Sequence, residues 1–224
     1  MKFTGIRAAI IDLDGTMIDT APDFHCAINR MRAELSLAPI DIALVMSFVG
    51  KGSENLMRRV LAVDYNEQDV ERHFDAALAS YQRHYLAING DYVTLYDHVH
   101  EGLAQLRQQQ IRLACVTNKP IAFALPLLER TGLRDYFELV YGGDSLPTKK
   151  PEPGPFLQVC ADFGITPVQV VAIGDSSNDA RAARAAGCHV LTVPYGYNHG
   201  EPVQSIDSDG IVQTLLEAAG LISH

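Results

Sequence analysis

The sequence feature that most constrains the fold is a short apolar run that ends on two acids. Residues 8–11 read Ala-Ala-Ile-Ile, and Asp12, Leu13, Asp14 and Gly15 follow directly. An apolar run of this length is typical of a buried strand. The spacing of the two acids places both carboxyl groups on one side of an extended chain, and the glycine lets the backbone turn. We therefore expect the two carboxyl groups to converge on one point.

Two converging carboxylates repel each other unless a cation lies between them or one of them holds a proton. A Mg²⁺ ion and a role in proton transfer would satisfy these conditions for Asp12 and Asp14. The alternative is a strand end followed by an ordinary solvated Asp-Gly turn. The rest of the chain decides between the two interpretations.

Residues 17–92 carry apolar side chains at helical spacing, which predicts an all-helical segment. Helices are expected to begin near Thr20, Asp41, Ser53 and Asn66, where polar or capping residues precede the apolar pattern. From Val93 onward, short apolar runs alternate with helical patterns. This alternation predicts a parallel sheet that is covered by helices on both faces.

The α/β part of the chain is expected to contain further strands and helices after the first strand. The predicted strands are 113–116, 137–141, 170–173 and 189–193, and the predicted helices are 101–110, 122–130 with a bend or restart at Pro126, 156–163, 180–186 and 211–219. We expect a Rossmann-like core of residues 1–16 and 93–224. Residues 17–92 would form an all-helical segment inserted after the first strand.

Polar side chains follow four of these strands. Thr117 and Asn118 come after the second strand, Lys150 lies in the loop after the third, and Asp175 and Asp179 follow the fourth. Ligands of open α/β sheets bind beyond the carboxyl ends of the strands. These side chains are therefore expected to gather around the two acids of the first strand.

A set of this kind suits phosphoryl transfer. A hydroxyl, an ammonium and backbone N–H groups can donate to phosphate oxygens, and carboxylates are the ligands that Mg²⁺ prefers. One carboxylate can accept the phosphoryl group while a second protonates the leaving oxygen and then activates water. Singly, each residue is also explained as a capped turn or a solvated loop charge, so the interpretation depends on the whole set.

The set resembles the haloacid dehalogenase superfamily of phosphatases. The matching segments are DLDGT at 12–16, VTN at 116–118, KKP at 149–151 and GDSSND at 174–179, in the order that the family has them. The family places a small helical cap between the first two segments, which implies that residues 17–92 form a helical cap domain inserted after the first strand. The resemblance implies a Mg²⁺-dependent phosphoric monoester hydrolase with a haloacid dehalogenase-like fold.

The resemblance also implies a role for each matching residue. Asp12 would be the nucleophile and a metal ligand, and Asp14 would be the general acid and base with its carbonyl on the metal. Lys150 would be catalytic, since it would neutralise charge on Asp12 and on the phosphoryl group. The remaining roles are phosphate binding by Thr117, Asn118 and Gly15, metal binding by Asp175, and support of the metal site by Asp179.

Three longer segments look like bacterial phosphoglycolate phosphatases, namely 48–61, 141–156 and 193–202. This narrower resemblance implies hydrolysis of 2-phosphoglycolate to glycolate and phosphate through an aspartyl-phosphate. The chain departs from that group at Tyr96-Asp97-His98-Val99, where those enzymes usually read Tyr-Pro-Gly-Val.

A closing cap would exclude water, and the carboxylate of phosphoglycolate would then need a positive or N–H partner. The turn of residues 50–53 offers an ammonium on Lys51 and the start of a helix. We expect Lys51 to bind this carboxylate, with Arg58 or Arg59 as the less favoured partner.

Other activities remain open at this stage. The alternatives are a phosphatase of other small metabolites such as sugar phosphates or pyrophosphate, and a phosphomutase of the same fold. A dehalogenase would need neither Asp14 nor Asp175, and a non-enzymatic binding module would tolerate the loss of a motif residue, although none is missing here.

Composition limits the partners and the location. A net charge of −9 argues against nucleic acid and anionic membrane surfaces, so the expected partner is a small phosphorylated metabolite, and the chain would be a monomer or homodimer. The four cysteines form no C-x-x-C pair, which favours free thiols in a reducing compartment. Because the sequence contains neither a signal-like segment nor a run of about 18 apolar residues, we expect a cytoplasmic protein.

Overall fold

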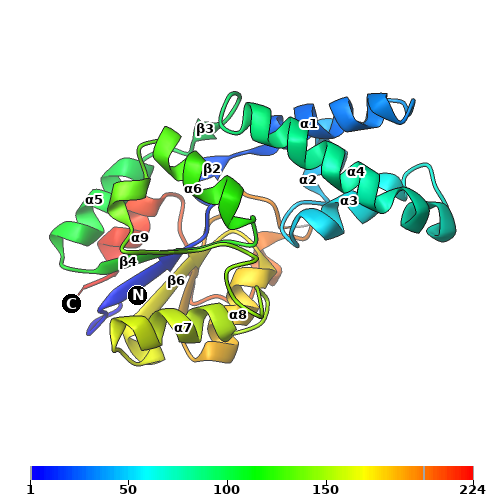
Figure 1. The fold of residues 1–224 in the computed structure, drawn as a ribbon. Helices are drawn as coiled ribbons and strands as arrows, with labels where there is room; N and C mark the ends of the chain where they lie inside the picture. The colour runs from blue at the N-terminus through cyan, green and yellow to red at the C-terminus, as the bar shows by residue number, and fades with distance from the viewer. Residues whose placement is uncertain (1, 199, 224) are drawn as a thin grey trace.

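A computed structural model describes residues 2–198 and 200–223, and a parallel sheet lies at the centre of its α/β part, among helices α5 to α9 (Figure 1). The sheet has six strands in the order β5-β4-β1-β6-β7-β8. Their bounds are β1 Ala8–Ile11, β4 Arg112–Val116, β5 Leu139–Tyr141, β6 Val170–Gly174, β7 His189–Thr192 and β8 Gly210–Ile211. The first strand is thus central, and its last residue, Ile11, pairs with Cys115 on one side and Ile173 on the other.

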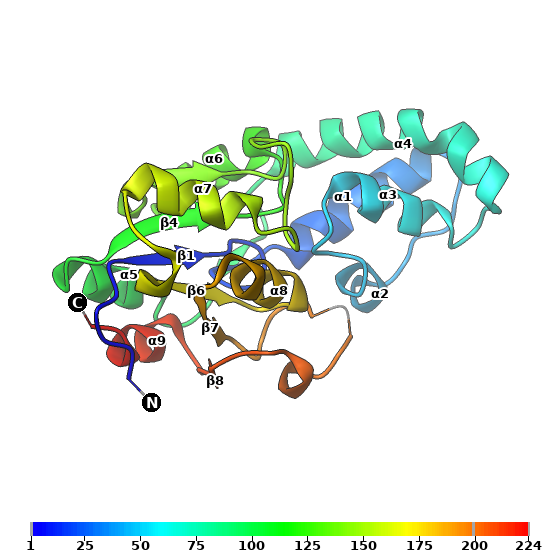
Figure 2. The same ribbon diagram turned by 90° about the horizontal axis from the view of Figure 1, so that it is seen from below.

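Successive residues of β1 contribute to two different hydrophobic cores. Ala9 and Ile11 pack with helices α5 (Val99–Gln108), α6 (Ile121–Arg130) and α9 (Leu215–Leu221) on one face of the sheet. Ala8 and Ile10 pack with α7 (Gly154–Phe163) and α8 (Ser177–Ala186) on the other face (Figure 2). Both faces of the strand are buried, which explains why its sequence is continuously apolar.

Four further helices lie beyond the carboxyl end of β1 and form a hydrophobic cluster of their own (Figure 1). They are α1 Ala21–Glu34, α2 Ile42–Met46, α3 Ser53–Leu61 and α4 Glu67–Ile88. The antiparallel strands β2 (Ile18–Asp19) and β3 (Thr94–Leu95) connect this helical layer to the sheet. Phe123 of α6 and Tyr197 also belong to the cluster, so the layer packs on the core next to the ends of the strands.

The predicted α/β fold with a Rossmann-like parallel sheet is confirmed, but several element bounds differ from the predictions. Helix α6 continues through Pro126 without a restart. The predicted helix of residues 211–219 is wrong at its start, because Ile211 pairs with β7 as part of β8 and the helix begins at Leu215. Helix α8 begins at Ser177, three residues before the predicted start, because Ser176 and Asp179 form a capping box.

The segment that departs from the phosphoglycolate phosphatase pattern is a turn before α5. His98 precedes the helix with a φ of 61°, a left-handed conformation that glycine adopts at least cost. The backbone therefore keeps the shape for which a glycine is suited, although this chain has a histidine there. Among the described residues, no helix is both long and apolar enough to cross a membrane.

Candidate active site

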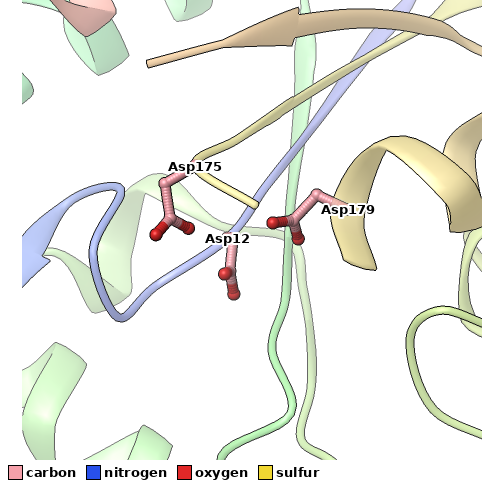
Figure 3. A group of neighbouring side chains, drawn as sticks. All are labelled: Asp12, Asp175 and Asp179. Carbon is pink, nitrogen blue, oxygen red and sulfur yellow. The ribbon is translucent and has the colours of Figure 1, made fainter. Parts of the chain in front are cut away.

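The carboxyl ends of β1, β4 and β6 bring the predicted site residues together. Asp12 directly follows β1, Asp175 directly follows β6, and Asp179 lies in the first turn of α8. Each offers a carboxylate oxygen, and these atoms all lie within 4.8 Å of one another. Figure 3 shows the three carboxyl groups, which come from three separate segments, facing one another. The acids that follow β1 and β6 therefore meet at this edge of the sheet, whereas Asp14, the second acid after β1, is not part of this group.

Lys150 connects two of these acids. Its Nζ lies 2.7 Å from Asp12 Oδ1 and 2.6 Å from Asp179 Oδ1, and it donates to the carbonyl oxygen of Val116 at 2.7 Å. The contacts with Asp179 and Val116 are hydrogen bonds, whereas the contact with Asp12 is an ion pair without hydrogen-bond geometry. Burial opposes the charge of Lys150, but the carboxylates of Asp12 and Asp179 outweigh it and raise the pKa above its ordinary value.

The acids carry more negative charge than Lys150 balances. Burial raises the pKa of Asp12 to about 7, against the opposing effect of Lys150. Burial, Asp179 and Asp12 raise the pKa of Asp175 well above its ordinary value. A divalent cation would supply the missing positive charge, and carboxylate oxygens suit a hard ion such as Mg²⁺. The donor set therefore fits a metal ion.

Asp175 is held from two sides. Its Oδ1 accepts from Thr16 Oγ1 at 3.1 Å, and its Oδ2 accepts from the backbone N–H of Tyr197. Gly15 makes this approach possible, since a Cβ at that position would lie 2.4 Å from Asp175 Oδ2. The N–H of Gly15 donates to the carbonyl of Ile18 at 2.9 Å, so the structure gives Gly15 a place in the turn that supports the acids.

Asp179 has two tasks that use different oxygens. Its Oδ1 contacts Lys150, while its Oδ2 accepts from the backbone N–H of Ser176 at 3.1 Å and from Ser176 Oγ at 2.6 Å. The start of α8 and the position of the Lys150 ammonium therefore depend on the same carboxylate.

Asp14 lies at the same strand end but has different partners. Its Oδ1 accepts from Thr20 Oγ1 at 2.8 Å and from Lys119 Nζ at 2.9 Å. The side chain of Lys119 is 2% exposed, and its Nζ also donates to Tyr85 OH at 2.6 Å. The sequence interpretation missed Lys119 and Tyr85, although the position of Lys119 directly after Thr117 and Asn118 was a usable signal.

Thr117 and Asn118 follow β4 and line the cavity beside the acids. Thr117 Oγ1 accepts from the backbone N–H of Lys119 at 3.1 Å, which leaves its hydroxyl hydrogen for an incoming oxygen. The side-chain amide of Asn118 donates to the carbonyls of Gly50 and Lys150, at 2.9 and 2.8 Å. In this conformation, the side chain of Asn118 links the turn before α3 to the loop that contains Lys150. A phosphoryl oxygen would therefore have to bind to the backbone of Asn118.

A cavity of about 40 Å³ lies between the sheet edge and the helical layer, which is room for about three water molecules. Its polar side includes the acids, Thr117 and the ammonium groups of Lys119 and Lys150. The opposite wall is mainly apolar and aromatic, and it includes Phe24, Leu56, Tyr81, Tyr85 and Phe123. The helical layer therefore closes over a space that suits a small molecule.

The turn of residues 50–53 reaches the cavity through Gly50, Gly52 and Ser53, whereas Lys51 is exposed and is not among the lining residues. The two arginines that were the less favoured partners bond within the helical layer. Arg59 donates to the carbonyl of Ser47 at 2.7 Å, and Arg58 pairs with Glu71. None of these three cations is among the residues that line the cavity.

Several known proteins resemble this chain over nearly its whole length. The sequence model of the haloacid dehalogenase-like hydrolases matches residues 9–193. The chain is 45% identical to the phosphoglycolate phosphatase of Thiobacillus denitrificans over 97% of its length and 96% of that protein. It is 48% identical to that of Nitrosospira multiformis, with the same coverage. The crystal structure of a predicted phosphoglycolate phosphatase from Haemophilus somnus superposes with a TM-score of 0.90 at 32% identity, covering 96% of this chain and 97% of that one.

Proposed function

Because the chain belongs to the haloacid dehalogenase-like hydrolases and is a phosphoric monoester hydrolase, we propose that its substrate is 2-phosphoglycolate. The products would be glycolate and phosphate, formed through an aspartyl-phosphate at Asp12 with the help of Mg²⁺. The observation that carries the proposal is one cavity in which Asp12 is paired with Lys150 while a second acid, Asp14, lies beside it. The substrate is supported by the names of the two relatives that match nearly the whole chain.

The reaction would proceed in two steps. A carboxylate oxygen of Asp12 attacks phosphorus as the bond to the alcohol oxygen breaks, and Asp14 gives that oxygen a proton. Asp14 then takes a proton from a water molecule, whose oxygen attacks the phosphoryl group and restores Asp12. The Thr117 hydroxyl would donate to a phosphoryl oxygen, and the charge of Lys150 would offset the negative charge of Asp12 and of the phosphoryl group throughout.

The metal site would use Asp12, Asp175 and the backbone carbonyl of Asp14, with Asp179 in support. Bound Mg²⁺ would neutralise negative charge on the phosphoryl oxygens. The close approach of three buried carboxylates supports this assignment, as does the raised pKa of Asp12 and Asp175.

We also propose that residues 17–92 act as a cap over a core of residues 1–16 and 93–224. The separate hydrophobic cluster of α1–α4 supports this division, as does the connection through the short strands β2 and β3. A cap of this kind excludes water during the reaction. The cytoplasm stays our predicted location, supported by the free thiols of all four cysteines, and a monomer or homodimer stays the predicted state.

A phosphate-release assay on a panel of substrates tests the proposal. The panel contains 2-phosphoglycolate, sugar phosphates, a nucleotide and pyrophosphate, each with Mg²⁺ and with EDTA. We expect the highest kcat/KM for 2-phosphoglycolate and no release in EDTA. A higher kcat/KM for a sugar phosphate or pyrophosphate would mean that this compound, and not 2-phosphoglycolate, is the substrate. Phosphate release in EDTA would remove the metal from the proposal. Interconversion of sugar phosphates without release of phosphate would favour the phosphomutase.

A further inference from the structure

Lys119 is a buried ammonium whose bonding capacity is only partly used by the protein. Within the described residues, its Nζ has two oxygen acceptors, Asp14 Oδ1 at 2.9 Å and Tyr85 OH at 2.6 Å. Because an ammonium has three N–H groups, one donor remains. Lys150 differs, since three protein oxygens, two of them from acids, lie within 2.7 Å of its Nζ. Lys119 is therefore the lysine of this cavity with a donor to spare for a ligand.

Lys119 lies where the leaving group, and not the phosphoryl group, would bind. In the proposed reaction, Asp14 protonates the leaving oxygen. Its Oδ1 is held by Lys119 and by Thr20, so Oδ2 is the oxygen left for that task. The Lys119 ammonium thus lies about one carboxyl group away from the leaving oxygen. The first atoms of the leaving alcohol would occupy the space beside it.

Two aromatic rings flank the Lys119 ammonium. The Phe24 ring centroid lies 4.5 Å from Nζ and the Tyr85 ring centroid lies 4.6 Å from it. These rings hold the ammonium in place but cannot solvate an anion. A carboxylate that is buried against such a wall needs a charged hydrogen-bond donor. The free N–H of Lys119 meets that need.

We propose that Lys119 binds a carboxylate carried by the leaving alcohol, so that the site selects phosphomonoesters of small hydroxy acids. The inference rests on the proposed function, because it uses Asp14 as the acid of the reaction. In phosphoglycolate the carboxylate carbon lies two bonds beyond the leaving oxygen, which matches the place of Lys119 next to Asp14. This assignment replaces Lys51 as the partner of the carboxylate.

The first test compares 2-phosphoglycolate with ethyl phosphate, in which a methyl group replaces the carboxylate. The Lys119→Met variant keeps the length of the side chain and removes the charge. Since Asp14 also loses a partner, both substrates are expected to slow. The ratio of the two kcat/KM values isolates the contribution of the carboxylate. We expect the preference for 2-phosphoglycolate over ethyl phosphate to fall by about 10- to 100-fold in the variant, as for the loss of other hydrogen bonds to charged groups.

A binding measurement removes the chemistry of Asp14 from the comparison. Calorimetry with Mg²⁺ present would compare 3-phosphonopropionate, which has a methylene in place of the leaving oxygen, with propylphosphonate, which lacks the carboxylate. Wild type should bind the first more tightly, and Lys119→Met should bind the two alike. Lys119→Arg, which keeps the charge, should retain part of the difference and serves if the methionine variant fails to fold.

Lys51→Met is the competing variant and should keep the wild-type preference. The proposal is overturned if Lys119→Met keeps the preference for the carboxylate in both assays, or if Lys51→Met loses it. In either case the wild-type preference for 2-phosphoglycolate stands, and only the assignment of Lys119 fails. A wild-type enzyme that treats 2-phosphoglycolate and ethyl phosphate alike would overturn the proposed substrate as well.

Discussion

The two sides of the cavity are built on different principles. At the sheet edge, three acids and Lys150 are buried together, and three protein oxygens lie within 2.7 Å of the Nζ of that lysine. On the other side, helices α1, α3 and α4 contribute mainly apolar and aromatic groups, and Lys119 lies at the junction. The sheet edge is suited to a phosphoryl group, whereas the wall is suited to the part of the substrate that varies. Reaction and selectivity are thus assigned to separate regions.

The difference follows from what each side must recognise. Fixed charges stabilise the charge that develops during phosphoryl transfer, and they act best when they cannot reorganise. Selection of a leaving group needs shape and a small number of oriented polar groups. Changes at the sheet edge should therefore affect all substrates alike, and changes at the wall should affect substrates unequally.

Asp12→Asn is the largest expected effect. An amide cannot serve as the nucleophile, so kcat should fall by at least about 10³-fold for 2-phosphoglycolate and ethyl phosphate alike. The measurement is steady-state phosphate release, with circular dichroism as the check that the fold is kept. Turnover near the wild-type rate would remove Asp12 from its role.

Lys150→Ala should lower kcat by about 10²-fold or more, because the site loses its fixed positive charge next to the phosphoryl group. The loss should again be equal for the two substrates. A rise in KM with an unchanged kcat would mean that Lys150 attracts the substrate without acting in the reaction. The sheet edge and the wall of the cavity would then differ less in their roles than we infer.

Metal binding should depend on pH because it competes with protons at the buried acids. Folding raises the pKa of Asp12 from 3.8 to about 7 in the metal-free protein. As pH rises, Asp12 therefore loses its proton in the unfolded chain before it does so in the folded protein. The stability that the protonated Asp12 side chain contributes is lost as pH rises from about 3.8 to about 7. In our proposal Mg²⁺ binds the ionised acids, so it should restore stability by about 2.7 kcal/mol at a 100-fold excess over its Kd.

Thermal unfolding measures this effect. The rise in Tm that Mg²⁺ causes should be larger at about pH 8 than at about pH 5, since protons occupy the acids at the lower pH. Asp175→Asn, which removes one proposed ligand, is the control and should reduce the rise at the higher pH. Equal rises at both pH values would place the bound metal elsewhere.

Tyr85→Phe tests the wall with the smallest change. It removes the hydroxyl that accepts from Lys119 Nζ and leaves the aromatic ring in place. Loss of one hydrogen bond to a charged group should lower kcat/KM for 2-phosphoglycolate by roughly fivefold to tenfold, and the effect on ethyl phosphate should be smaller. Equal effects on both substrates would mean that the wall contributes to the reaction itself.

The sequence predicted the sheet edge better than the wall, and the reason is local. Asp12, Thr117 and Asp175 each directly follow a strand, and parallel strands end at the same edge, so their meeting could be foreseen. The wall combines Phe24, Tyr85 and the start of α6, which are far apart in the chain and meet only when the helical layer packs on the core.

The lysines at positions 51, 119 and 150 show the same limit of what the sequence could predict. Lys150 could be assigned because it belongs to a motif, whereas Lys51 was favoured for its place in a glycine-rich turn and proved to be exposed. The burial of Lys119 depends on the packing of Tyr85 and Phe24 around it, which no spacing in the sequence shows. The early start of α8 was missed in a similar way, because its capping box uses an acid that was assigned to the metal site.

The central claim is that Asp12 carries the phosphoryl group between the two steps, and trapping that group tests it most directly. In Asp14→Asn, p-nitrophenyl phosphate should still transfer its phosphoryl group, because p-nitrophenol leaves without a proton, but hydrolysis of the intermediate should be slow. Acid quenching and peptide mass spectrometry should then find one phosphoryl group on Asp12. A burst of p-nitrophenol with the phosphoryl group on another residue, or with none bound, would contradict the account.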